Sequence, residues 1–284
     1  MSSSAGAIRL FSLLLGVIVF FAYQPEGLFD AFAKKEGWMK RYTYSLENGT
    51  SVSYMKAGTE GSRRIIYVHG TPGGADNWDN YIAQPIADAE SFSIDRPGFG
   101  YSIPKVAKPS LQRQVAAILP LLTDSGHGLP ILVGHSLGGP IIARAAVDYP
   151  DKVGGLVVVA GALDPELEKL RWYNRLADFP LVKAILPKSL RISNDELLPL
   201  KGELSEMKPL LTQMECPVII IHGTRDFLVP VGNVDFMQRE FGANVIESIV
   251  IEGGDHFLIW NQEKIVRSAI EKLLTINNEE QVIR

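Results

Sequence analysis

Residues 130–139 read PILVGHSLGG, a short apolar run followed by a glycine-rich turn. Residues 131–133 predict a buried strand, and the residues after the turn predict an amphipathic helix that runs to about Tyr149. Ser136 falls at the junction, in the pattern G-x-S-x-G. A serine at such a sharp turn has a strained backbone, and flanking glycines remove side chains that would clash. The pattern therefore predicts a serine hydroxyl that projects above the edge of a sheet, at the N-terminus of a helix.

The same alternation of short apolar runs and helical stretches covers the chain from about residue 41. Two runs, RYTYSL and TSVSYMKA, flank an Asn-Gly turn signal and predict a hairpin. Six further runs predict strands: RIIYVHG, ESFSID, PILVGH, VGGLVVVAG, PVIIIHG and VIESIVIEG. Short apolar strands joined by helices indicate a mostly parallel sheet covered by helices on both faces. We therefore expect one α/β domain over residues 34–284.

One connection, residues 162–215, is longer than a single crossover helix needs. Its first part, residues 164–200, is rich in apolar residues and is interrupted by Pro180 and Pro187, which predicts two or three short helices. Residues 204–214 read as the crossover helix itself. A lid over the carboxyl edge of the sheet is the functional interpretation, and a surface insertion that packs only its own apolar face is the alternative.

The N-terminal region contains an uncharged apolar run, LFSLLLGVIVFFAY, at residues 10–23. A membrane-spanning helix takes about 20 apolar residues, so this run better fits a signal peptide or a short signal anchor. We expect residues 1–33 to be such a segment with its linker, and the protein to be exported or membrane-associated through it. Residues 31–33 have the small-x-small form of a cleavage site, but they lie well beyond the run. An N-terminal helix packed on the domain is the alternative.

Composition excludes several classes of function. The chain has 284 residues, with 28 Lys and Arg against 32 Asp and Glu, and no block of like charge. It lacks the basic surface that binding to a phosphate backbone requires, so we expect no nucleic-acid partner. The single cysteine, Cys216, allows neither an internal disulfide nor a thiolate metal cage. We expect no metal and no cofactor.

A serine hydroxyl is a weak nucleophile at neutral pH, so it needs a histidine base and a group that orients that histidine. His256 lies in a glycine-rich loop just past the last predicted strand, at the edge where a base could reach Ser136. It is the candidate base. Each of the other histidines ends a strand, adjoins the serine or lies in an exposed loop, and we expect these to hold loops or face solvent: His69, His127, His135 and His222.

Asp226 is the best candidate for the acid. It lies in the loop after PVIIIHG, and it gives the chain order Ser, Asp, His. Asp164, just past the preceding strand, could also reach the histidine and remains a rival. Asp255 would point away if its neighbour His256 faces the serine.

Backbone amides are the expected stabilisers of a developing oxyanion. The Leu137 amide lies at a helix N-terminus, where free N–H groups and partial positive charge favour an anion. The second donor should come from the loop HGTPGG at residues 69–74, where we expect the Thr71 amide, unless that loop is only a tight turn. The segment DRPGFGYS, residues 95–102, is expected to be a structural turn whose Asp and Arg bond to backbone.

Five segments in this order, HGTPGG, DRPGFGYS, GHSLGG, HGTRDFLVP and GGDHF, resemble the α/β-hydrolase superfamily, in its serine esterase and lipase-like branch. The resemblance covers about residues 41–274. It implies a mostly parallel eight-stranded sheet with a small helical lid between strands six and seven. It also implies Ser136 as nucleophile, His256 as base and Asp226 as acid, with an oxyanion hole formed by the Thr71 and Leu137 amides.

Related activities of the superfamily fit less well. Haloalkane dehalogenases and epoxide hydrolases share HGxP and DRPGFG, but they attack with an aspartate where this chain has Ser136. Residues 72–74 are similar to those of proline iminopeptidases, whose elbow usually has Trp where this chain has Leu137. We therefore expect a serine hydrolase that cleaves a small-molecule carboxylic ester through an acyl-enzyme. Amide, lactone, thioester and carbon–carbon bond hydrolysis stay open, as does a catalytically idle membrane-tethered binding protein.

Overall fold

Eight strands form a single sheet in the order β1-β2-β4-β3-β5-β6-β7-β8 in a computed structural model that describes residues 40–282. Strand β2 runs antiparallel to its neighbours β1 and β4, and the other neighbouring pairs are parallel. The predicted mostly parallel α/β sheet is confirmed. The strands are β1 (Arg41–Ser45), β2 (Ser51–Gly58), β3 (Arg63–Val68), β4 (Ala89–Ile94), β5 (Ile131–His135), β6 (Gly155–Val159), β7 (Val218–Gly223) and β8 (Val245–Ile251).

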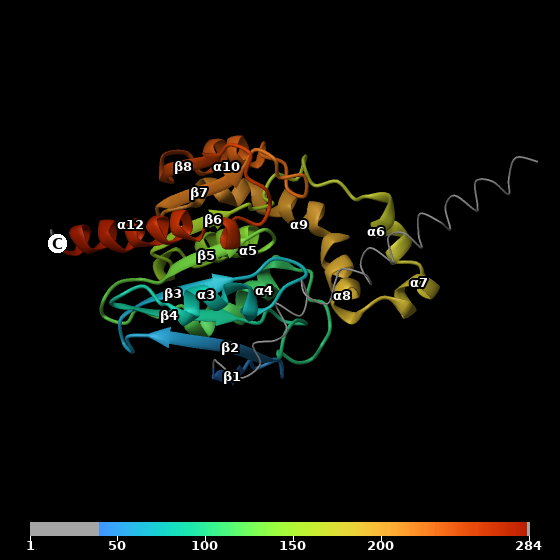
Figure 1. Ribbon diagram of the computed structural model, residues 1–284, viewed down its shortest axis with the longest axis horizontal. Coiled ribbons are helices and arrows are strands. Elements are labelled where there is room, and N and C mark those ends of the chain that lie inside the picture. Colours follow the sequence, from blue (N-terminus) through green and yellow to red (C-terminus); the bar gives the residue numbers. More distant parts are fainter. Residues whose placement is uncertain (1–39, 283–284) are drawn as a thin grey trace, which may run out of the picture. The chain divides into compact units, whose positions relative to one another are not determined.

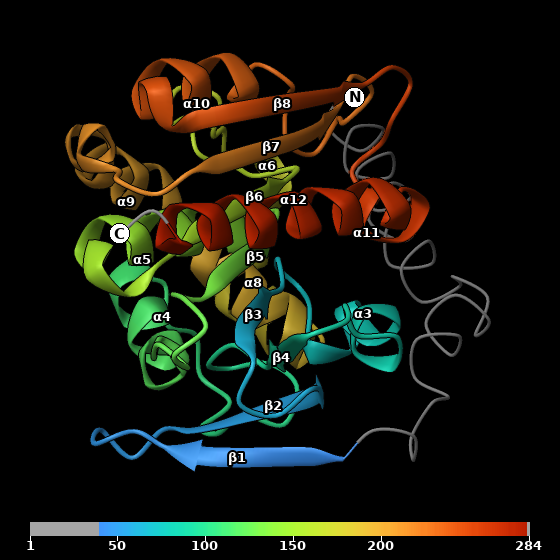
Figure 2. The same ribbon diagram turned by 90° about the vertical axis from the view of Figure 1, so that its left-hand side faces the viewer.

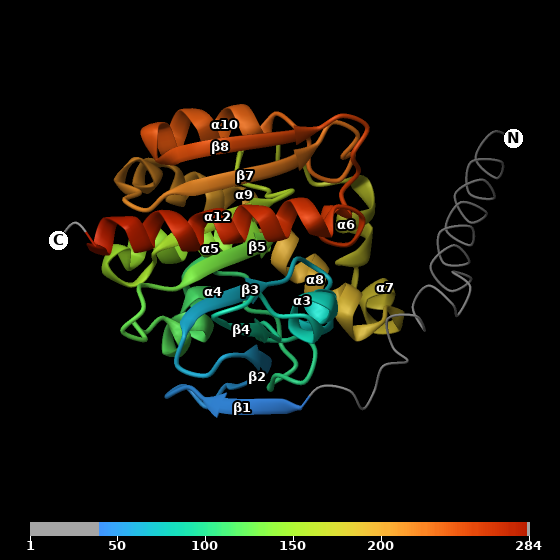
Figure 3. The same ribbon diagram turned by 60° about the vertical axis from the view of Figure 1, so that its left-hand side comes forward.

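Helices cover both faces of this sheet. Figure 3 shows α12 lying across one face, and Figure 2 shows α4, α5 and α10 along the other side. The long α12 contacts β5 and β6, whereas α5 contacts the same strands from the opposite side, as right-handed crossovers require. These helices are α3 (Asp79–Ala83), α4 (Leu111–Ile118), α5 (Gly138–Asp148), α10 (Asn233–Phe241), α11 (Leu258–Asn261) and α12 (Glu263–Val282).

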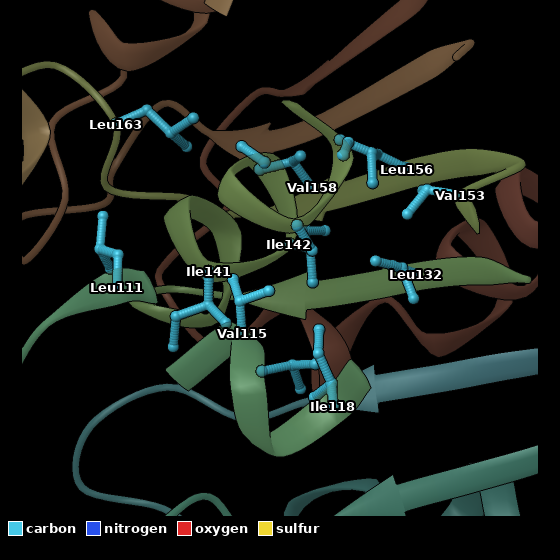
Figure 4. Packing of buried hydrophobic residues seen from close by; sticks show 14 of the residues in the cluster. Leu111, Val115, Ile118, Leu132, Ile141, Ile142, Val153, Leu156, Val158 and Leu163 are labelled. Carbon is cyan, nitrogen blue, oxygen red and sulfur yellow. The ribbon is translucent and has the colours of Figure 1, made fainter. Parts of the chain in front are cut away.

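A hydrophobic core cluster lies between the central strands and the helices on one face, and Figure 4 shows the part beside α4 and α5. Leu132 on β5 and Val158 on β6 point toward α5, where Ile141 and Ile142 are fully buried. Burying one such side chain stabilises the fold by about 1.5–3 kcal/mol. Every residue of β5, β6 and β7 is buried, because helices cover both of their faces. The turn between β5 and α5 is therefore anchored on both sides by buried elements.

The long connection between β6 and β7 contains four α-helices. They are short, as the prolines that interrupt this segment predict. Pro180 begins α7 and Pro187 precedes α8, so each proline stands where its missing N–H breaks no helical hydrogen bond. Figure 1 shows α6, α7 and α8 beyond the end of the sheet toward which the β3 arrow points. The helices are α6 (Trp172–Ala177), α7 (Pro180–Ile185), α8 (Lys188–Leu197) and α9 (Leu200–Met207).

The crossover helix predicted at residues 204–214 needs a correction. Helix α9 begins at Leu200, because Leu200, Leu204 and Met207 bury one continuous face against the core. The chain then tightens into a 3₁₀ helix over residues 208–213, which has a proline in its first turn.

The predicted N-terminal segment, residues 1–33 with the apolar run 10–23, lies outside the described residues. Among the residues described, no helix combines the length and the apolar character needed to cross a membrane.

Candidate active site

Ser136 lies between β5 and α5 with a φ of +55°, a conformation that is uncommon for a residue with a side chain. Glycines make this turn sterically feasible. A Cβ on Gly134 would lie 2.4 Å from the Gly138 carbonyl oxygen, and one on Gly138 would lie 2.2 Å from the Val68 carbonyl oxygen. The strained serine turn predicted from G-x-S-x-G is therefore present.

His256 and Asp226 meet in a buried hydrogen bond. Nδ1 of His256 lies 2.7 Å from Oδ2 of Asp226, and its N–H donates to this carboxylate oxygen. In the neutral imidazole with this tautomer, Nε2 is the nitrogen that can accept a proton. The other carboxylate oxygen accepts hydrogen bonds from the Leu228 and Val229 amides, at 2.9 and 2.8 Å. Burial raises the pKa of Asp226, but the hydrogen bonds from His256 and Val229 outweigh it, so the net pKa lies below the ordinary value.

The two rival carboxylates take other partners. Oδ1 of Asp164 accepts a hydrogen bond from the Glu166 amide, two residues along the chain. Oδ1 of Asp255 accepts one from the Phe257 amide, on the exposed side of its loop. Asp226 is therefore the carboxylate that the fold brings to His256.

His135 links the serine turn to the histidine loop. Burial and the neighbouring His256 lower the pKa of His135 to about 3, so its ring is neutral at physiological pH. Its Nε2–H donates to the backbone carbonyl oxygen of His256 at 2.9 Å. Because His135 directly precedes Ser136, this bond holds the two loops together.

The other histidines make contacts of their own, although Nε2 of His222 also lies 3.6 Å from Oδ2 of Asp226. His69 accepts a hydrogen bond from the Arg96 amide, and His222 donates to the Val229 carbonyl oxygen. Burial lowers the pKa of both rings. His127 is exposed. His69 and His222 thus bond to loop backbone and His127 faces solvent, which are the positions that the sequence predicts.

The loop after β3 passes directly over the serine. A Cβ on Gly70 would lie 2.8 Å from Cβ of Ser136 and 3.3 Å from its Oγ, so only glycine lets the backbone approach this closely. Within the described part of the chain, no residue accepts a hydrogen bond from the amide of Thr71 or Leu137. An oxyanion hole requires amides without an internal acceptor, and both meet this condition within the described residues.

Comparison with known families agrees with this arrangement. A sequence model of the family described as "alpha/beta hydrolase fold" matches residues 63–184, which span β3, the serine turn and the start of the insertion. The strand order and the strand–serine–helix elbow complete the pattern. The chain therefore has the α/β-hydrolase fold.

Individual relatives are similar in sequence to part of this chain. A dihydrolipoyllysine-residue acetyltransferase component of an acetoin cleaving system from Cupriavidus necator is 31% identical over 129 residues, 45% of this chain and 34% of that protein. A 2-hydroxy-6-oxononadienedioate/2-hydroxy-6-oxononatrienedioate hydrolase from Burkholderia vietnamiensis is 32% identical over 139 residues, 46% of this chain and 48% of that protein. The chain thus spans about half or less of the curated relatives that it matches.

Solved structures extend the likeness to the whole fold. A structure from a study of Nitrososphaera gargenis carboxylesterases matches with a TM-score of 0.67 and 18% identity, and covers 84% of this chain and 100% of that chain. At this identity the likeness concerns the fold alone.

The domain also contains a buried ion pair that sequence reasoning missed. Arg96 and Glu196 are each 1% exposed, and two guanidinium nitrogens donate to the two carboxylate oxygens at 2.9 and 3.1 Å. Glu196 also accepts hydrogen bonds from the Thr71 hydroxyl and from the side-chain amide of Gln114, both at 2.8 Å. Arg96 in turn donates to the Gly70 carbonyl oxygen. Glu196 thus joins helix α8 of the insertion to the loop over Ser136.

The segment at residues 95–102 is the structural turn that the sequence predicts. Asp95 accepts hydrogen bonds from the Ala75 and Tyr101 amides, and Arg96 donates to backbone carbonyls. Two ion pairs of this segment are not predicted by the sequence: Asp95 pairs with Arg41, and Arg96 pairs with Glu196. Neither partner lies in a recognisable motif, so only the folded chain reveals them.

Proposed function

We propose that the protein is a serine hydrolase that cleaves a carboxylic ester through an acyl-enzyme intermediate. One observation carries the proposal: the buried hydrogen bond from His256 to Asp226, linked through His135 to the strained turn at Ser136. A histidine oriented by a carboxylate beside an activated serine is the arrangement that acyl transfer requires.

In this mechanism the Ser136 hydroxyl attacks the ester carbonyl while Nε2 of His256 accepts its proton. The imidazolium that forms is stabilised by Asp226, whose lowered pKa keeps it ionised at neutral pH. His256 then passes the proton to the departing alcohol, and a water molecule activated by the same histidine releases the acid.

The negative charge on the tetrahedral intermediate needs donors that are already in position. The Thr71 and Leu137 amides supply them in the proposal. Neither has a hydrogen-bond acceptor among the described residues; Leu137 follows Ser136 in the chain, and Thr71 follows Gly70, which packs against Ser136. One such donor accounts for about 10²–10³ in rate in enzymes of this kind.

The test starts with a fluorophosphonate probe, which reacts with activated serines, on the full chain in detergent. We expect the wild type and the exposed control Ser205→Ala to be labelled, and Ser136→Ala to stay unlabelled. A p-nitrophenyl ester series from acetate to palmitate then measures turnover. Labelling with turnover that peaks at one acyl length supports an esterase, and absence of labelling would overturn the proposal in favour of a binding protein.

Carbon–carbon bond hydrolysis is the second candidate. The observation that favours it is the Burkholderia vietnamiensis relative, whose name describes hydrolysis of an oxo-dienedioate. If Ser136 is labelled but no ester is turned over, this candidate replaces the esterase. Incubation with a 2-hydroxy-6-oxo-dienoate, followed by its absorbance, then tests it directly.

We further propose that the insertion acts as a lid and that residues 10–23 export the protein or attach it to a membrane. The position of α6, α7 and α8 beyond the sheet supports the first idea (Figure 1). The uncharged apolar run supports the second. N-terminal sequencing of the protein from fractionated cells distinguishes a cleaved signal from a retained anchor.

A further inference from the structure

The insertion exposes several large apolar side chains. Phe179 is 66% exposed, Leu181 82% and Ile185 74%, and all three lie in or next to α7. Trp172 and Tyr173 begin α6 with about half of their surface exposed, and their rings lie 6.0 Å apart. A single exposed apolar residue is common on soluble proteins, but a group of them indicates an interaction surface.

Residues 170–191, here called the insertion tip, also carry an excess of positive charge. They contain five basic residues and one acidic residue, in a chain whose net charge is −4. Lys183 forms ion pairs with Asp178 and Asp195. The remaining cations form no salt bridge with any residue that the structure describes: Arg171, Arg175, Lys188 and Arg191. Arg171 also interacts electrostatically with Glu168, which precedes the tip. The insertion tip therefore combines exposed apolar side chains with a net positive charge.

We propose that the insertion tip docks on the surface of an anionic lipid bilayer. Short helices with Trp, Phe and Leu on one side and Lys and Arg on the other are typical of segments that lie in the membrane interface. Trp and Tyr favour the headgroup level, and anionic headgroups attract basic segments. A second copy of the tip would meet like charge, which disfavours self-association. The apolar run at residues 10–23 is an independent sequence feature that points to a membrane.

The insertion tip adjoins the proposed active site. Figure 1 shows α7 at the end of the insertion farthest from the sheet. At the other end, the Arg171 guanidinium donates to the Phe227 carbonyl oxygen at 3.5 Å. Phe227 directly follows Asp226, and its side chain is 72% exposed. Docking of the insertion tip would therefore bring the loop that carries Asp226 close to the bilayer surface.

A fluorescent label in the insertion tip tests this docking in the full chain. Leu181→Cys, labelled with the polarity-sensitive dye NBD, reports entry into lipid. Cys216 should stay unlabelled because burial raises the pKa of its thiol to about 12. Asp151→Cys is the matched control, since Asp151 is exposed and lies before β6, at the opposite edge of the sheet.

We expect reconstitution into vesicles of phosphatidylcholine and phosphatidylglycerol to shift the emission at position 181 to the blue and to raise it severalfold. Vesicles of phosphatidylcholine alone should give a smaller change, and the label at position 151 should not respond. An equal response of the two labels in all vesicles would overturn the proposal. So would a response at position 181 that depends on protein concentration without lipid, which would assign the surface to a second copy.

Charge reversal separates electrostatic attraction from apolar contact. Each cation near an anionic surface changes partitioning by about fivefold, so Arg175→Glu with Lys188→Glu should remove most of the phosphatidylglycerol dependence. Lys264→Glu, an exposed change on α12, is the control and should leave it intact. An unchanged lipid preference in the double variant would contradict docking through these cations. None of these measurements depends on the chemistry at Ser136.

Discussion

Glu196→Gln should destabilise the protein by about 3–5 kcal/mol, because it removes the charge of one partner in a buried ion pair. Glu196 accepts four hydrogen bonds: two from Arg96 and one each from Thr71 and Gln114. A glutamine in its place has one oxygen to accept them and turns an N–H₂ group toward the donors. Arg96, 1% exposed, then keeps an uncompensated charge in the interior. The expected loss is a large part of the roughly 5–15 kcal/mol that stabilises an ordinary domain.

Urea unfolding of the full chain in detergent, followed by circular dichroism, measures this loss. Glu206→Gln is the control, since Glu206 is exposed on the neighbouring helix α9 and the change should cost less than about 0.5 kcal/mol. Because Thr71 and Gly70 share the network, kcat of the folded variant should also fall more than KM rises. A loss of stability under about 1 kcal/mol for Glu196→Gln would refute the reasoning that this pair holds α8 to the loop over Ser136.

Three further predictions concern single residues of the site. His256→Ala should lower kcat/KM for an ester by several orders of magnitude, whereas the exposed His127→Ala should leave it near the wild-type value; similar losses in both would contradict the assignment of the base. Asp226→Asn should lower kcat by about 10⁴-fold in the same assay, and a larger loss in Asp164→Asn would move the acid to the earlier loop. The pKa of His135 is about 3 in the folded chain, against 6.5 for an ordinary histidine. As the pH drops below 6.5, the unfolded chain therefore binds a proton at His135 that the folded chain does not, and stability falls until the pH reaches about 3. Between pH 6.5 and 5 this amounts to about 2 kcal/mol, and urea unfolding of His135→Gln should show a pH dependence weaker by that amount; an unchanged pH dependence would mean that His135 is not buried in its neutral form.

Local sequence patterns were sufficient for much of the fold and for the candidate residues. The G-x-S-x-G pattern between an apolar strand and a helix predicts the strained turn at Ser136, because steric limits on that turn act within a few residues. Apolar runs predict β3 to β8, and the Asn-Gly turn signal predicts the β1–β2 hairpin, because both signals are local. The catalytic roles of Ser136, Asp226 and His256 stay predictions until activity is measured.

Other features depend on contacts between distant segments. The crossover helix begins at Leu200 rather than at residue 204, because tertiary packing buries Leu200, which its local pattern did not reveal. Glu196 lies in an insertion without a motif, and its importance arises only when α8 packs over Arg96, 100 residues earlier.

The sequence by itself determined the order of elements, the serine elbow and a short set of candidate acids and bases, because propensity, periodicity and turn sterics are local. The tertiary structure alone decided that Asp226 rather than Asp164 meets His256, and that Glu196 ties the insertion to the loop over the serine. These choices depend on distances between side chains far apart in the chain. Such distances are set by how the whole sheet twists and packs, which no local pattern encodes.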